Sequence, residues 1–289
     1  MVFIVDKYLF SHTQLKPAAY AFYVGLFGGL SILLFPFGFK VLPIDQMLIS
    51  FVAGVSFVLA IFFFYKSIQL GEVSRITPII GGLIPLFTFV FTYFVLNERL
   101  TSVQMIAFCF LVFGGVVMAW PRKQIRSVSG LVKTPLIKRL PLAIAAALFF
   151  TASYVLTKYI YTLQPFINGF IWIRLGGVMG SLFFFILPIS RRAIMETSSK
   201  VKLKTGGLAV INKGLSGLAF ILLNYAIFLG SVTLVNALQG VQYIFLLVVA
   251  LFLSKKFPQI LREQVNQSAI LQKVMSILFI ILGLGILAF

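Results

Sequence analysis

Nine long apolar stretches dominate the sequence and constrain its fold more than any other feature. They cover residues 17–38, 46–65, 73–96, 101–120, 140–158, 166–188, 207–229, 232–253 and 271–289. A helix of about 20 residues spans the hydrocarbon core of a bilayer. Backbone groups in that core must be hydrogen-bonded within a helix or a closed barrel. Barrel strands alternate apolar and polar residues, and these stretches do not. The sequence therefore predicts an all-α polytopic membrane protein.

Composition excludes a water-soluble globule. The chain has 289 residues, of which 61% are hydrophobic and 10% charged, whereas soluble domains are about 45–50% apolar and about 25% charged. One cysteine, Cys109, excludes an internal disulfide, and one histidine, His12, argues against a histidine-ligated metal site. The spans carry no paired carboxylates, and no glycine-rich phosphate loop precedes a Lys-Ser/Thr pair. We therefore expect neither a cofactor nor an enzymatic activity.

The basic residues indicate how the chain is oriented. The formal net charge is +18, which is typical of nucleic-acid-binding proteins, but most of these residues lie in short connections between apolar stretches. Only Lys40, Arg99 and Lys158 fall on one face, and the remaining basic connections fall on the other. The positive-inside rule predicts that the more basic face is cytoplasmic. We expect it to rest on anionic lipid headgroups and expect no nucleic-acid partner.

The two halves of the sequence repeat the same order of motifs. In the first half these are 4–8, Pro17, Gly28, 68–74 and Gly81, and in the second half they are 154–159, Pro165, Gly176, 227–233 and Gly240. An odd number of helices in each half gives the halves opposite orientations, as in many secondary transporters. We predict two inverted five-helix repeats, residues 1–121 and 140–289, joined by a basic linker at 122–139.

The first predicted helix is incomplete. In the second half a run of apolar residues from Leu140 precedes the motif at 154–159, but almost nothing precedes the matching motif at 4–8. We therefore expect a ten-helix architecture with a truncated first helix. The alternative is a nine-helix protein with a short re-entrant start.

One segment of the first half resembles a known family. Ile76-Thr77-Pro78, Pro85 and the sequence Leu-Asn-Glu-Arg-Leu-Thr at 96–101 lead into a glycine pair at 114–115. This pattern resembles the drug/metabolite transporter superfamily, and specifically its EamA-like transporters. The resemblance implies a multi-pass transporter with ten helices, and we expect it in the plasma (inner) membrane of a prokaryote. The second half departs from the pattern, with Lys-Lys-Phe-Pro at 255–258 in place of the glutamate turn.

Two basic residues lie well inside apolar stretches and are candidate substrate-binding residues. An intramembrane charge costs several kcal/mol unless it faces a cavity or a partner. Arg174 also matches a basic residue often found at this place in the resembled family, and Lys213 shares a helix face with Phe220 and Asn224. Tyr154 is a further candidate. The alternative is that both basic residues snorkel or bind backbone carbonyls where helices pack.

A second group of candidates is polar but uncharged. Asn236, Gln239 and Gln242 recur every three residues, with Tyr243 adjacent, and the equivalent helix of the first half carries Thr77 and Gly81 among other residues. Glycine and proline at matching places mark helices that can open their backbone where transporter sites form. The alternative is that the amides form hydrogen bonds between helices.

These residues predict a secondary transporter that moves a small amino-acid-like or amphiphilic metabolite by alternating access. The amides would orient the substrate, and Lys213 or Arg174 would attract a carboxylate or phosphate. The carboxylates lie near the ends of spans or in loops, and we assign Asp45, Glu196 and Glu263 to loops. Because none is predicted at mid-membrane, where proton-coupled carriers commonly keep one, uniport or exchange is favoured over proton coupling. The alternatives are a flippase for a lipid-linked substrate and a non-transporting membrane scaffold subunit.

Overall fold

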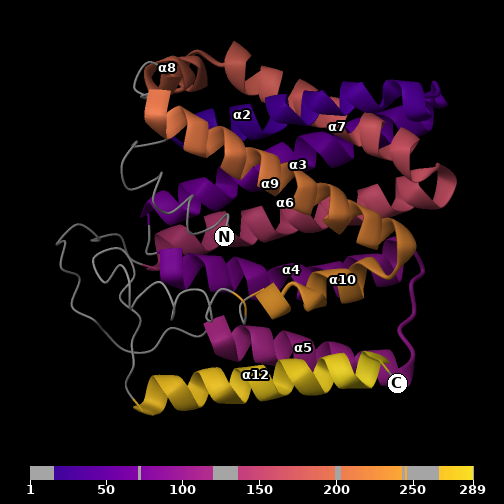
Figure 1. Cartoon of the computed structure of the whole chain (residues 1–289), viewed down its shortest axis with the longest axis vertical. Helices are drawn as coiled ribbons and strands as arrows, with labels where there is room; N and C mark the ends of the chain where they lie inside the picture. The colour runs from indigo at the N-terminus through magenta and orange to yellow at the C-terminus, as the bar shows by residue number, and fades with distance from the viewer. Residues whose placement is uncertain are drawn as a thin grey trace. The chain divides into compact units, whose positions relative to one another are not determined.

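The computed structural model describes residues 16–70, 73–119, 136–198, 203–242, 245 and 267–288. Every regular element within these residues is a helix (Figure 1), which confirms the all-α prediction. The elements are α2 (Pro17–Gly28), the 3-10 helix η1 (Gly29–Phe37), α3 (Ile44–Leu70), α4 (Val73–Val95), α5 (Ser102–Ala119), α6 (Leu136–Leu163), α7 (Phe166–Ile186), α8 (Pro188–Ser198), α9 (Leu203–Leu229), α10 (Val232–Leu238) and α12 (Gln267–Ala288). The predicted incomplete first helix and the basic linker lie outside the described residues.

Four described segments are long and apolar enough to cross a membrane: Pro17–Phe37, Ile44–Gln69, Leu140–Leu163 and Phe166–Ile186. Shorter apolar helices cover Ile79–Val95, Ser102–Val117, Gly214–Leu229 and Leu271–Leu287. Large apolar side chains such as Phe94 are exposed on these helices, as expected where the solvent is lipid rather than water.

The helices pack into two compact units. Unit 1 combines Ser67–Ile144 with Thr233–Phe289, and unit 2 combines Val2–Lys66 with Ala145–Val232. Unit 1 therefore contains α4, α5, α10 and α12, while unit 2 contains α2, η1, α7, α8, α9 and most of α3 and α6. Each unit thus takes helices from both halves of the sequence. The units reflect packing, and the repeat boundaries at 1–121 and 140–289 stay predictions.

Within unit 2, the second helices of the two predicted repeats run antiparallel. A Cβ atom added at Gly25 of α2 would lie 2.7 Å from Cβ of Ser181 on α7, and one added at Gly28 would lie 3.6 Å from Cδ of Arg174. Residue numbers thus rise along α2 as they fall along α7. Opposite directions of equivalent helices are what inverted repeats require.

Within unit 1, the fourth and fifth helices of the repeats show the same relation. Thr88 and Thr92 of α4 bond Asn236 and Thr233 of α10, respectively, so these helices also run antiparallel. On α5 and α12, Gly114 faces Ser276 and Ile280, whereas Gly283 faces Ala107 and Leu111. Figure 1 shows α5 and α12 side by side. All three equivalent pairs that pack against each other within a unit are therefore antiparallel.

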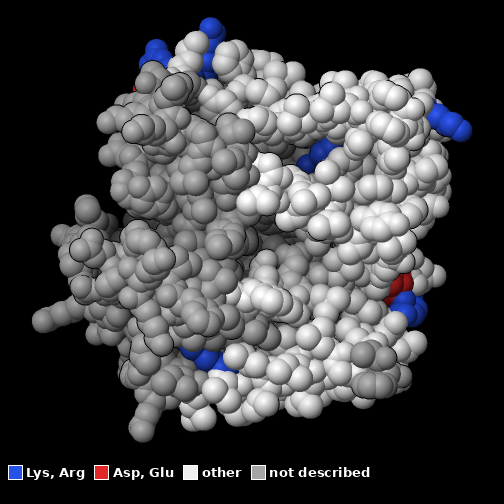
Figure 2. Space-filling view, viewed as in Figure 1, with Lys and Arg blue, Asp and Glu red and all other residues white. Residues whose placement is uncertain are grey.

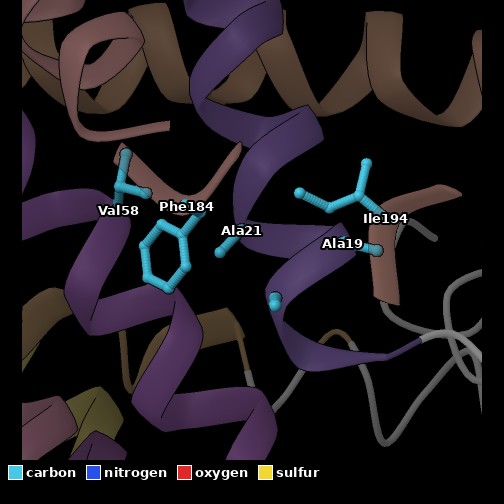
Figure 3. Close-up of a cluster of buried hydrophobic side chains, with 6 residues drawn as sticks. Ala19, Ala21, Val58, Phe184 and Ile194 are labelled. Atoms are coloured by element: carbon cyan, nitrogen blue, oxygen red, sulfur yellow. The ribbon is translucent and has the colours of Figure 1, made fainter. Parts of the chain in front are cut away.

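Small residues on α2 allow its neighbours to approach closely. Ala19 and Ala21 are fully buried and form a cluster with Val58 of α3, Phe184 of α7 and Ile194 of α8 (Figure 3). Without a hydrophobic driving force between helices in lipid, such close van der Waals packing holds spans together. This cluster ties four elements of unit 2 into one core.

Two loop assignments from the sequence are wrong. Glu196 lies on α8, a helix that begins with Pro188 directly after the extended Leu187 ends α7. Proline at the first helical position is pre-organised for helix formation. Asp45 lies in the first turn of α3, where a negative charge interacts favourably with the helix dipole. Glu263 lies outside the described residues.

Candidate functional site

Polar side chains of α4 and α10 form a hydrogen-bonded line inside unit 1. Asn236 Nδ2 donates to Thr88 Oγ1 at 3.2 Å, and Gln239 Nε2 donates to Asn236 Oδ1 at 2.8 Å. One turn away, the hydroxyls of Thr92 and Thr233 are 2.8 Å apart. The structure therefore brings two of the predicted amides together with α4. It also engages Asn236 in contacts of the kind that hold helices together.

The α-helix α10 gives way to tighter turns beside these amides. The helix ends at Leu238, and the N–H groups of Gln239 and Gly240 donate to the carbonyls three residues earlier at 3.3 and 3.1 Å. By contrast, α4 continues without a break through Gly81 and Pro85. Within the described residues, α-helical geometry therefore stops beside Gly240 but continues past Gly81, and the predicted opening of these helices stays a prediction.

A cavity of about 20 Å³ lies beside the end of α10. It is lined in part by Gly81, Pro85, Asn236, Gln239 and Gly240. A single water requires about 10–15 Å³ of such space, so this cavity has room for one water and is too small for a metabolite. A metabolite contacting Gly81, Asn236 or Gln239 here would require the helices to separate.

The remaining polar candidates of this group are Thr77, Gln242 and Tyr243. Thr77 Oγ1 is buried and has no hydrogen-bond partner among the described residues. The backbone N–H of Gln242 donates to Gln239 O at 3.2 Å. Tyr243 lies outside the described residues. The substrate-binding role of all these side chains stays a prediction.

Arg174 of α7 is a buried cation in unit 2. Its side chain is 7% exposed. Its guanidinium carbon lies 4.3, 4.9 and 5.6 Å from the ring centres of Phe220, Phe57 and Phe170. Among the described residues, its Nε has no hydrogen-bond partner and no carboxylate forms an ion pair with it. In Figure 2, basic atoms are visible at the bottom of an opening over α7 and α9.

Aromatic rings alone compensate this charge only in part. A cation over a ring gains about 0.5–2 kcal/mol, whereas burial of a charge in a membrane or protein interior costs several kcal/mol. An unsatisfied buried donor such as the Nε of Arg174 costs about 1–3 kcal/mol more. An anion placed beside this guanidinium would therefore gain both an ion pair and a hydrogen bond.

Asn224 and Tyr154, two other predicted site residues, are occupied by packing. Tyr161 donates to Asn224 Oδ1 at 3.1 Å, and Asn224 Nδ2 donates to Phe220 O at 2.9 Å. The buried ring of Tyr154 stacks on Phe150 at 6.0 Å. The backbone of Lys213 lies in α9, but its side chain lies outside the described residues.

Lys158 of α6 has a role that the sequence analysis missed. Its Nζ donates to the carbonyls of Ile227, Phe228 and Gly230 at 2.9, 3.1 and 2.6 Å. The last carbonyls of a helix have no partner within it, and a cation there also interacts favourably with the helix dipole. Lys158 therefore caps α9. In the sequence, the capping role of Lys158 was indicated by no more than its place on the same helix one turn before Tyr161.

Replacing Lys158 with methionine should destabilise the protein by about 2–4 kcal/mol, because hydrogen bonds to a charged group contribute about 1.5–3 kcal/mol and the carbonyls lose their partner. Thermal unfolding of purified protein measures the effect. Lys158→Arg, which restores a cationic donor, should recover most of it. Equal melting of Lys158→Met and the wild type would contradict the capping role.

The comparisons with known proteins agree with this architecture. Residues 1–120 match the EamA-like transporter family. No curated protein matches the chain. Among solved structures, 26 chains match. One crystal structure aligns with a TM-score of 0.59 and 16% sequence identity, covering 94% of this chain and 85% of its own. At that identity the likeness concerns the fold alone.

The apolar helices, the antiparallel pairs and the match over residues 1–120 agree with one another. The match begins before α2 and ends just after α5, so it covers the first predicted repeat. The protein is an integral multi-pass membrane protein whose residues 1–120 are similar to the EamA-like transporter family.

Proposed function

We propose that the protein is a secondary transporter that moves a small metabolite bearing an anionic group by alternating access, without enzymatic chemistry. The metabolite would be amino-acid-like or otherwise amphiphilic. We further propose that it works in the plasma (inner) membrane of a prokaryote. The one-sided distribution of basic connections, which follows the positive-inside rule, supports a plasma-membrane orientation.

The antiparallel arrangement of equivalent helices supports alternating access. In carriers built from inverted repeats, one bundle rocks against another around a substrate site. Here α2 and α7, α4 and α10, and α5 and α12 are antiparallel. The helices pack into two compact units that are each held together internally. Such units are suited to move as bodies.

The observation that carries the proposal for the cargo is Arg174. Its side chain is buried, its Nε has no partner among the described residues, and the centres of three phenylalanine rings lie within 5.6 Å of its guanidinium carbon. A carboxylate or phosphate would pair with the guanidinium. The neighbouring rings favour a cargo whose remaining part is apolar. An amphiphilic anion therefore suits Arg174 better than a fully polar one.

A scaffold subunit is the second candidate, because Asn236 and Gln239 are hydrogen-bonded within unit 1. Polar residues used in this way hold a bundle together and need no substrate. This candidate offers no counter-ion for the buried charge of Arg174 among the residues that the structure describes, however. We therefore rank the transporter first.

Flux through reconstituted protein tests the proposal. Purified full-length protein in liposomes is screened with radiolabelled amino acids, organic acids and nucleobases, with empty liposomes as the control. We expect saturable uptake of at least one carboxylate with an apolar side chain, and no uptake of its neutral carboxamide. Absence of saturable flux for every compound would favour the scaffold. Equal flux of the acid and the carboxamide would contradict the role of Arg174.

A further inference from the structure

The start of α2 and the end of α7 lie at the same end of unit 2, because these helices are antiparallel. The rings of Phe22 and Phe185 stack at 5.7 Å there. The short helix α8 follows at once and packs against both helices. Figure 1 shows α8 close to end-on, whereas α7 and α9 run across the view. If α7 and α9 cross the bilayer, α8 therefore lies along the membrane surface.

The faces of α8 differ in a way that suits this position. Ile194 is 3% exposed and packs among Ala18, Ala19 and Phe184. Arg191, Arg192, Met195 and Glu196 are exposed, and we call these four side chains the α8 surface. Basic and apolar side chains that share an exposed face are typical of helices seated at the headgroup boundary.

The α8 surface carries a net positive charge. Its acidic member, Glu196, forms an ion pair with Lys16 at the start of α2. The guanidinium of Arg191 lies 5.4 Å from the ring of Phe185, which holds it at the end of α7. Neither Arg191 nor Arg192 forms an ion pair within the part of the chain that the structure describes. Two neighbouring guanidinium groups are well suited to bind a phosphate.

We propose that the α8 surface binds the headgroup of an anionic phospholipid. Arg191 and Arg192 bind the phosphodiester, and Met195 enters the boundary between headgroups and acyl chains. Attraction between an anionic lipid surface and each nearby basic residue is appreciable at physiological ionic strength. The inference rests on the position and charge of α8, and does not depend on what the protein transports.

A fluorophore on α8 makes the binding measurable. Met195→Cys is introduced in a Cys109→Ser background and labelled, and the full-length protein is reconstituted into phosphatidylcholine vesicles. Brominated phosphatidylglycerol or brominated phosphatidylcholine is then added as a quencher. We expect phosphatidylglycerol to quench at a much lower mole fraction than phosphatidylcholine. Arg191→Gln and Arg192→Gln should each weaken the binding of phosphatidylglycerol near position 195 about five-fold.

Lys40→Gln is the matched control. It also removes one exposed positive charge, but the backbone N–H of Lys40 bonds Asn168 near the start of α7, at the opposite end from α8. Its effect on quenching at position 195 should be less than two-fold. Arg191→Lys and Arg192→Lys, which keep the charge, should retain the preference and show that loss in the glutamine variants is not misfolding.

Three results would overturn the proposal. Equal quenching by the two lipids would show that the α8 surface does not select an anion. An equal loss in Lys40→Gln would show that the preference comes from net charge alone. Relief of quenching by millimolar glycerol 3-phosphate would show that the arginines bind a soluble phosphate rather than a lipid.

Discussion

Alanine at position 54 should prevent stable folding, because α3 and α7 touch there through their backbones. A Cβ atom at Gly54 would overlap the carbonyl oxygen of Ile173 and the backbone nitrogen of Gly177, and would lie 2.6 Å from the carbonyl carbon of Gly176. Backbone atoms cannot rotate away as a side chain does, so the helices must separate. We expect a loss of about 3 kcal/mol or more, at the upper end of overpacking effects.

The yield of monodisperse detergent-extracted protein and its melting temperature measure this effect. Gly217→Ala is the matched control, since a Cβ atom there meets nothing within 4 Å. Because alanine is favoured over glycine inside a helix by about 0.5–1 kcal/mol, this control should melt at the wild-type temperature or slightly above. If Gly54→Ala were extracted and melted like the wild type, the close contact between α3 and α7 would be wrong.

Arg174→Gln should reduce transport of an anionic substrate about 10- to 100-fold. Hydrogen bonds to charged groups contribute about 1.5–3 kcal/mol, and glutamine keeps a polar donor but loses the charge. Folding should be affected little, because removal of the buried cation also removes its desolvation cost. Initial rates of carboxylate uptake into proteoliposomes, normalised to the amount of protein, measure the effect.

The control for Arg174→Gln is Lys40→Gln, which removes an exposed charge outside the proposed site and should leave the rates unchanged. Arg174→Lys should recover part of the activity, because it restores the charge without the planar fork of donors. If Arg174→Gln melted normally and transported the carboxylate at the wild-type rate, Arg174 would have only a packing role.

Hydropathy predicted most helix positions well because backbone in hydrocarbon has few alternatives to a helix. The stretch 73–96 became α4 (Val73–Val95), and 166–188 became α7 (Phe166–Ile186). By contrast, α8 contains two arginines and a glutamate, so an apolar window does not detect it. Its formation depends on Ile194 packing against other helices, which local sequence does not report.

The candidate sites were predictable only in part. Spacing placed Asn236 and Gln239 on one face of a helix, but the partner of Asn236 is Thr88, 148 residues away in the chain. Arg174 was detectable as a charge in an apolar stretch. Phe170 lies one turn before it on α7, but Phe57 and Phe220 belong to α3 and α9, and only the fold brings these two rings to Arg174.

The composition of unit 1 has a consequence for biosynthesis. The glycine-containing face of α5 packs on α12, which is the last described helix of the chain. At about 5–20 residues per second, the ribosome needs roughly 10–30 seconds to synthesise the residues between them. During that interval α5 lies in the membrane or the translocon without α12 packed against it. If the ribosome stalled between α5 and α12, the nascent chain would expose the helix face of α5 that normally packs on α12. Membrane proteases and insertases could recognise this exposed face.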